Sequence, residues 1–138
     1  MSELKPAAFV WPVRVYFEDT DAGGVVYHSR YLNFFERART EMMRARGLSM
    51  TELKEKHKLI WVVLDINARF MQAAKLDDEL LVTAEVTWMK GVRQGFRQQM
   101  TRKEDGVLIA TAELSAVMLH ADSLRPARMP AWIKAELD

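Results

Sequence analysis

The stretch from Glu18 to Ala45, EDTDAGGVVYHSRYLNFFERARTEMMRA, decides how this chain folds. It starts as an acidic turn that contains two glycines and then becomes the most regular helical pattern in the sequence. Its apolar residues recur at helical spacing on one stripe, which comprises Tyr31, Phe34, Phe35, Ala38, Met42 and Ala45. Because this stripe is wide and aromatic, we expect a deeply packed helix that ends at Gly47.

Strand patterns flank this helix on both sides. Before it, a period-two alternation is typical of a half-buried strand, with Trp11, Val13, Val15 and Phe17 on one face. After it, Ser49 to Glu52 has the form of a capping box and predicts a second, short helix. Alternation then predicts four further strands, at about residues 60–70, 80–88, 96–102 and 107–119. Pro130 predicts the beginning of a short final helix.

Short connections are predicted between the four later strands. Residues 76–78 predict a turn, residues 91–95 a loop, and residues 103–106 a hairpin with glycine at the position that needs a positive φ. The third of these strands is polar, so we expect one of its faces to be exposed. The last strand carries small residues on one face, which let a bulky neighbour approach closely; they are Ala110, Ala112 and Ala116.

The order of these elements predicts an α+β fold. Strands joined by short turns are antiparallel, and a helix with a wide apolar stripe must lie against their face. We therefore expect a five-stranded antiparallel sheet, with the four later strands in hairpin succession, wrapped around one central helix. No linker-like stretch interrupts the sequence, so residues 1–138 are predicted to form a single domain. An open sheet edge makes dimerisation by edge pairing an expected way to protect it.

Composition and charge exclude several classes of function. Lys and Arg number 20 and Asp and Glu 19, a net charge of +1 that gives no electrostatic case for nucleic-acid binding. The absence of cysteine excludes disulfides, a cysteine nucleophile and cysteine-ligated metal. The apolar patch Ala7–Trp11 is too short for a signal peptide, and no apolar run approaches the length that spans a bilayer. We therefore expect a cytoplasmic protein without stable membrane insertion.

Common catalytic and cofactor motifs are absent from the sequence. It contains no Gly-x-Ser-x-Gly, no dinucleotide or P-loop glycine pattern and no His-Glu-x-x-His. A calcium loop beginning at Asp19 is excluded, because its third ligand position holds Gly23 and its twelfth position Arg30. We therefore expect neither a metal nor an organic cofactor.

The acidic turn and the helix start remain as the candidate site. The segment 18–31 gathers three carboxylates, two glycines, one histidine and two tyrosines just before and within the first turn of the helix. Free N–H groups at a helix N-terminus stabilise a developing oxyanion, and Gly23 and Gly24 let the backbone approach a ligand. A carboxylate held there acts as a general base or a nucleophile. The alternative is structural: the acidic residues complement the helix dipole, and the two glycines form a turn.

The motif from Tyr16 to Arg39 resembles the signature of hotdog-fold acyl-CoA thioesterases. Within the 4-hydroxybenzoyl-CoA thioesterase-like family it resembles the Tol–Pal-associated YbgC group, and the similarity extends over nearly the whole chain. The resemblance implies a hotdog fold and hydrolysis of acyl-CoA, or of acyl groups on acyl carrier protein, to free acid and thiol. It further implies a homo-dimer or homo-tetramer with the active site at the subunit interface.

The same resemblance assigns roles by position. Asp21 matches the family's catalytic aspartate, which activates water or attacks the thioester carbonyl, and must face a cleft between protomers to do so. The backbone near His28 matches the group that polarises that carbonyl. The His28 side chain orients water, assists proton transfer or only binds. The substrate-binding positions are Gly24, Val25, Tyr27 and Tyr31. Glu18 and Asp19 are predicted to position the loop rather than react.

Several points stay open at the level of the sequence. A hydroxyacyl dehydratase of the same fold needs a His-x-x-Pro setting, whereas His28 is followed by Ser29-Arg30-Tyr31. A non-catalytic hotdog module that binds acyl carriers or partner proteins is the second alternative. The candidate cations for the CoA phosphates are Lys90, Arg93, Arg97, Arg125 and Arg128. The nine methionines would form an adaptable acyl slot or fill gaps in the core.

Overall fold

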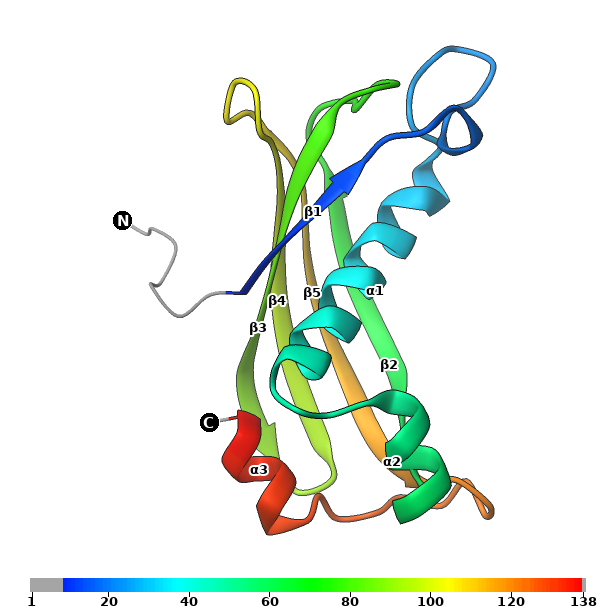
Figure 1. Cartoon of the computed structure of the whole chain (residues 1–138), viewed down its shortest axis with the longest axis vertical. Coiled ribbons are helices and arrows are strands. Elements are labelled where there is room, and N and C mark those ends of the chain that lie inside the picture. The colour runs from blue at the N-terminus through cyan, green and yellow to red at the C-terminus, as the bar shows by residue number, and fades with distance from the viewer. Residues whose placement is uncertain (1–8, 138) are drawn as a thin grey trace.

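The computed structural model describes residues 9–137 of the chain (Figure 1). The expectation that the N-terminus holds no targeting segment falls partly on residues 1–8 and lies outside this range. The strands are β1 (Phe9–Arg14), β2 (Leu59–Phe70), β3 (Glu79–Lys90), β4 (Arg93–Arg102) and β5 (Leu108–His120). The helices are α1 (His28–Ala45), α2 (Met50–His57) and α3 (Ala131–Leu137), with a 3₁₀ turn at Phe17–Asp19. None of the helices in this range is long and apolar enough to cross a membrane.

The five strands form one antiparallel sheet in the order β1-β3-β4-β5-β2. Figure 1 shows α1 running along one face of this sheet, and it packs against β1 and β3. The α+β class and the hotdog architecture predicted from the sequence are confirmed. The tight hairpin between β4 and β5 is also confirmed, with Gly106 at φ +73°.

The predicted succession of hairpins is wrong at its first step. β2 and β3 follow one another in the sequence but lie apart in the sheet, because β4 and β5 stand between them. Within residues 9–137, β2 pairs with β5 alone, from Leu59 opposite His120 to Phe70 opposite Ala110. The connecting residues 71–78 therefore cross the end of the sheet instead of forming a tight turn. Alternation reveals that a segment is a strand, but it carries no information about the strand's partner.

The stripe of α1 forms the centre of the core. Tyr31, Phe34, Phe35, Ala38 and Met42 are all buried, as predicted, whereas Ala45 at the helix end is exposed. The three alanines of β5 are buried in the same core. Gly47 follows the helix with φ +82°, the left-handed conformation that glycine adopts without strain. The predicted cap of α2 is present, since the Ser49 hydroxyl accepts a hydrogen bond from the Glu52 N–H at 3.2 Å.

β1 is shorter than its alternation predicts. It ends at Arg14, and the chain then turns into the 3₁₀ segment, so Val15 is buried while Phe17 is 81% exposed. The expectation that Phe17 lies on the buried face of a strand is therefore wrong.

β4 begins earlier than predicted, and its exposed residues Arg93 and Arg97 lie on one face, as expected. It includes Gly95, which was expected in a loop. A side chain at this position would collide with the Trp88 ring, so the packing of Trp88 across the strand requires glycine here. Its polar residues Gln94 and Gln98 are fully buried. Gln98 Nε2 donates to the carbonyls of Phe35 at 2.9 Å and Thr83 at 3.1 Å, so burial costs it little.

Candidate active site

The site loop, residues 15–27, joins β1 to α1 and is fixed by Asp19. The Asp19 side chain is buried, and its Oδ2 accepts a hydrogen bond from the Tyr16 N–H at 2.8 Å. Its Oδ1 lies 3.7 Å from Arg30 Nε, and its carbonyl accepts from the Tyr27 N–H at 2.9 Å. Asp19 thus connects the beginning and the end of the loop, in keeping with the positioning role predicted for it, while Glu18 is exposed.

Asp21 lies at the exposed tip of the site loop. Its Oδ1 accepts hydrogen bonds from the N–H groups of Gly23 at 2.8 Å and Val25 at 3.4 Å. The turn is closed by the Asp21 N–H, which donates to the Val25 carbonyl at 2.9 Å. Within residues 9–137, Oδ2 makes no hydrogen bond with the protein. One carboxylate oxygen is therefore held in place and the other is free to interact with a ligand.

The two glycines shape this turn in different ways. Gly24 has φ +83°, a conformation that disfavours any residue with a side chain. At Gly23 a Cβ atom would lie 3.2 Å from Asp21 Oδ1, close enough to displace the carboxylate by a few tenths of an ångström. Gly24 is thus explained by its backbone conformation, and Gly23 by the placement of the Asp21 carboxylate.

The helix start lies next to this turn. α1 begins at His28, and no side chain caps its N-terminus. An uncapped first turn presents N–H groups and the positive end of the helix dipole. The rings of Tyr27 and His28, both exposed, contact one another with 4.3 Å between centroids. The turn, the helix start and this aromatic pair therefore share one end of the molecule.

Tyr31 is placed differently from the other candidate residues. Its side chain is buried, and its ring packs on Phe70 with 5.3 Å between centroids. Its hydroxyl accepts a hydrogen bond from the Ala74 N–H at 3.1 Å. Within a single subunit, the Tyr31 side chain connects α1 to the 71–78 segment and does not line an open surface.

Three cavities open on the described part of the chain, and Asp21 is not among the residues that line them. The cavity of about 400 Å³ lies between α1, α2 and β2 and is lined mostly by apolar side chains, Met43, Met50, Trp61 and Phe96 among them. Cavities of about 350 and 430 Å³ lie beside β1 and over the sheet, and Asp21 lines none of the three. Among residues 9–137, no three His, Asp or Glu side chains gather as metal ligands. The expectation that Asp21 faces a cleft between protomers therefore stays a prediction.

The chain is similar to known proteins over nearly all of its length. The family model described as the thioesterase-like superfamily matches residues 15–137. The chain belongs to this superfamily. Acyl-CoA thioesterase YbgC of Haemophilus influenzae is 42% identical over 92% of each chain. Acyl-CoA thioester hydrolase YbgC of Escherichia coli is 41% identical over 96% of this chain and 98% of its own.

The fold of this thioesterase-like chain matches a solved member closely. A 1,4-dihydroxy-2-naphthoyl-CoA thioesterase from Synechocystis superposes with a TM-score of 0.88, covering 95% of this chain and 96% of that one. Sequence identity to it is 22%, so the likeness shows the fold alone. The family match and the relatives that are 41–42% identical confirm that the resemblance seen from Tyr16 to Arg39 is a family relation.

Sequence reasoning missed one part of the site of this thioesterase-like chain. The 71–78 segment contacts the site loop through Val26 and Ala74, and it contacts α1 through Tyr31. Residues 76–78 were predicted only as a turn. Nothing in the sequence signals that this turn lies beside residues some 50 positions earlier, because that proximity arises from the crossover between β2 and β3.

Proposed function

We propose that this chain hydrolyses the thioester of acyl-CoA to the free acid and the thiol, with Asp21 as the catalytic carboxylate. The observation that carries the proposal is the exposed Asp21 carboxylate, held by Gly23 beside an uncapped helix start in a chain of the thioesterase-like superfamily. Relatives that span nearly the same length are named acyl-CoA thioesterases. Acyl carrier protein presents the same thioester and is the second carrier that the site would accept.

The reaction needs a base, a water molecule and a donor for the carbonyl oxygen. The free Oδ2 of Asp21 takes a proton from water, whose oxygen bonds to the thioester carbon. The C–S bond then breaks, and Asp21 returns the proton to the departing sulfur, so the thiol leaves and the carboxylate is regenerated. Alternatively the carboxylate itself attacks the carbon, the C–S bond breaks and the thiolate leaves, and water then hydrolyses the resulting anhydride to the free acid and the carboxylate, the released proton converting the thiolate to the thiol. In both routes Oδ1 keeps the hydrogen bond that it accepts from the Gly23 N–H, which holds the carboxylate in its orientation.

The helix start supplies the oxyanion donor in this proposal. A thioester carbonyl is weakly stabilised by resonance, so a single oriented amide assists its addition step. The backbone N–H groups of the first turn of α1, which begins at His28, lie at the positive end of the helix dipole. A positioned base contributes about 10²–10⁴-fold and an oxyanion donor about 10²–10³-fold, so the two together replace a catalytic triad.

The remaining candidate residues surround this pair of groups. Gly24 and Val25 form the backbone wall that the thioester approaches, and Tyr27 and His28 flank it with exposed rings. Tyr31 contributes from beneath by holding the 71–78 segment. His28 orients the attacking water or binds the substrate.

A homodimer completes the site in this proposal. β2 forms one edge of the sheet, and its apolar side chains there are 39–50% exposed; they include Val62, Val63, Leu64 and Ile66. An exposed, apolar edge strand of 12 residues favours pairing with a second copy. Pairing there would bring a partner subunit to the face that carries α1 and supply the cleft that Asp21 lacks in one chain.

The compartment we propose is the cytoplasm.

The activity is tested by measuring thiol release from a panel of acyl-CoAs. We expect turnover on at least one chain length, with first-order loss of the thioester and one thiol per acid formed. The non-catalytic alternative predicts that the same acyl-CoAs bind, as calorimetry would show, while thiol release stays at the rate of uncatalysed hydrolysis in buffer. Binding without turnover across the whole panel would refute the proposed function.

A further inference from the structure

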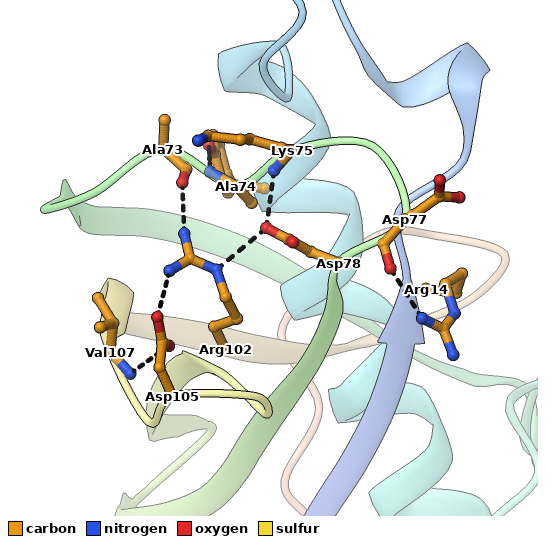
Figure 2. A network of polar contacts seen from close by, with 10 residues as sticks. Arg14, Ala73, Ala74, Lys75, Asp77, Asp78, Arg102, Asp105 and Val107 are labelled. Carbon is orange, nitrogen blue, oxygen red and sulfur yellow. Dashed lines mark hydrogen bonds and ion pairs between the residues drawn. The ribbon is translucent and has the colours of Figure 1, made fainter.

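Arg102, the last residue of β4, joins three separate elements of the fold. Its Nη2 donates to the Ala73 carbonyl at 2.9 Å, its Nε to Asp78 Oδ2 at 3.1 Å, and its Nη1 to Asp105 Oδ2 at 2.9 Å (Figure 2). The side chain is 16% exposed. The hydrogen bonds that Arg102 donates to Asp105 and Asp78 raise the pKa of Arg102, so its side chain stays charged. All three guanidinium nitrogens are thus engaged.

The two carboxylates that Arg102 contacts are themselves fixed. Asp78 Oδ2 also accepts a hydrogen bond from the Lys75 N–H at 2.9 Å, and Asp105 Oδ1 accepts from the Val107 N–H at 3.1 Å. Figure 2 shows these contacts spreading from the guanidinium to the 71–78 segment on one side and to the β4–β5 hairpin on the other. Arg102 therefore anchors the middle of the 71–78 segment to the rigid sheet.

The ends of the 71–78 segment do not depend on Arg102. Met71 N–H donates to the Ile109 carbonyl at 2.8 Å, and Asp77 N–H donates to the Val15 carbonyl at 3.0 Å. Between these points, the hydrogen bonds that Ala73, Ala74 and Lys75 make within the described residues go to Arg102, Asp78, Tyr31 and the site loop, while Ala74 is also buried in the core. Among these hydrogen bonds, those of Arg102 are the link from the sheet to the middle of the segment.

That middle part is the partner of the site loop. The Ala74 carbonyl accepts a hydrogen bond from the Val26 N–H at 2.9 Å, and Lys75 forms an antiparallel bridge with Val25. Val25 in turn accepts from the Asp21 N–H and donates weakly to the Asp21 carboxylate. A continuous series of hydrogen bonds therefore runs from the sheet through Arg102 to the Asp21 turn. Figure 1 places all of these segments at one end of the sheet.

We propose that Arg102 is a positioning residue for Asp21, holding the 71–78 segment so that Val25 and Val26 keep the Asp21 turn in its working geometry. This inference rests on the proposed function for its effect on turnover, but its structural part does not. Arg102 touches no substrate in this proposal and acts only through the backbone of the 71–78 segment.

The matched control is Arg97 on the same strand. It also lies between two carboxylates, Glu85 at 3.5 Å and Glu113 at 3.6 Å, but its pairs are on the exposed sheet surface, away from the 71–78 segment. Arg102→Gln and Arg97→Gln therefore remove the same charge from the same strand. Only the first removes the anchor of Ala73.

Amide hydrogen exchange tests the inference without any need for activity. In Arg102→Gln we expect the Val26 amide to exchange at least about 10-fold faster than in the wild type, because its acceptor segment is released. In Arg97→Gln the Val26 amide should exchange as in the wild type. Arg102→Lys keeps the charge but lacks the planar fork, so it should fall between wild type and Arg102→Gln. It also serves if the glutamine variant does not fold. Unchanged Val26 exchange in Arg102→Gln, or in the lysine variant if only that one folds, would overturn the proposal.

Turnover supplies the second readout. Because a misplaced catalytic group loses rate steeply, we expect Arg102→Gln to lower kcat by about 10-fold or more with little change in KM. In the Asp21→Asn background the same change should cost almost nothing further, since the group it positions is gone. An additive loss in the double variant would refute positioning through Asp21. If the wild type releases no thiol at all, the proposed function fails, while the exchange experiment still decides the role of Arg102.

Discussion

Gln98 offers a quantitative test of the packing between α1 and the sheet. Its side chain is fully buried, donates to the carbonyls of Phe35 and Thr83, and accepts from Arg39 NH1 at 2.9 Å. Burial lowers the pKa of Arg39, an effect that the nearby Glu36 opposes. Because the Arg39 guanidinium is partly removed from water, the hydrogen bond that it donates to Gln98 Oε1 stabilises it in the fold.

Gln98→Leu removes these three hydrogen bonds at nearly constant volume. The two neutral bonds contribute about 1 kcal/mol each and the bond from the charged Arg39 about 1.5–3 kcal/mol. Burial of the leucine side chain returns about 1–2 kcal/mol. The net expected loss in the free energy of unfolding is about 1.5–4 kcal/mol.

Urea denaturation followed by circular dichroism measures this loss. With a typical slope for a small protein, the midpoint should fall by about 1–2 M. The control is Gln99→Leu, since the Gln99 side chain makes no hydrogen bond within residues 9–137 and its change should cost less than about 0.5 kcal/mol. Equal midpoints for Gln98→Leu and the wild type would refute the proposed role of the buried network.

Three further predictions concern the turn, the network and the edge. Gly24→Ala should lower Tm by roughly 3–8 °C, because φ +83° costs an alanine about 1–2 kcal/mol, whereas Gly23→Ala should reduce turnover more than stability. The pKa of Asp105 is lowered, mainly by the Val107 N–H, so its charged form stabilises the fold above the ordinary value of 3.8. Asp105→Asn should therefore be less stable than wild type at about pH 7, with a gap that narrows at about pH 3, as urea curves would show; a constant gap would contradict this. Ile66→Lys on β2 should shift sedimentation towards the monomer, while Val10→Lys on the opposite edge strand should not; a dimer that survives Ile66→Lys excludes pairing through β2.

The helix and the turn before it were predictable because their signals are local. The stripe of α1 depends only on spacing within one segment, and the family motif placed Asp21 just ahead of the helix start at His28. The β4–β5 hairpin was predictable for the same reason, since Gly106 marks it directly.

Features that depend on partners distant in sequence could not be predicted. Gln98 is buried because Phe35, Thr83 and Arg39 meet it there, and they lie between 15 and 63 positions away. The separation of β2 from β3 reflects strand pairing, which alternation does not encode. The contact between Arg102 and Ala73 likewise arises from the crossover that this pairing produces.

The rate of thiol release by Asp21→Asn tests the proposed chemistry most directly. Asparagine keeps an oxygen that accepts from the Gly23 N–H, so the turn and Tm should be preserved while the base or nucleophile is lost. On the best acyl-CoA of the panel, kcat should fall by about 10²–10⁴-fold, with the exposed Asp122→Asn variant unchanged. Turnover by folded Asp21→Asn within a few-fold of the wild type would contradict the assignment.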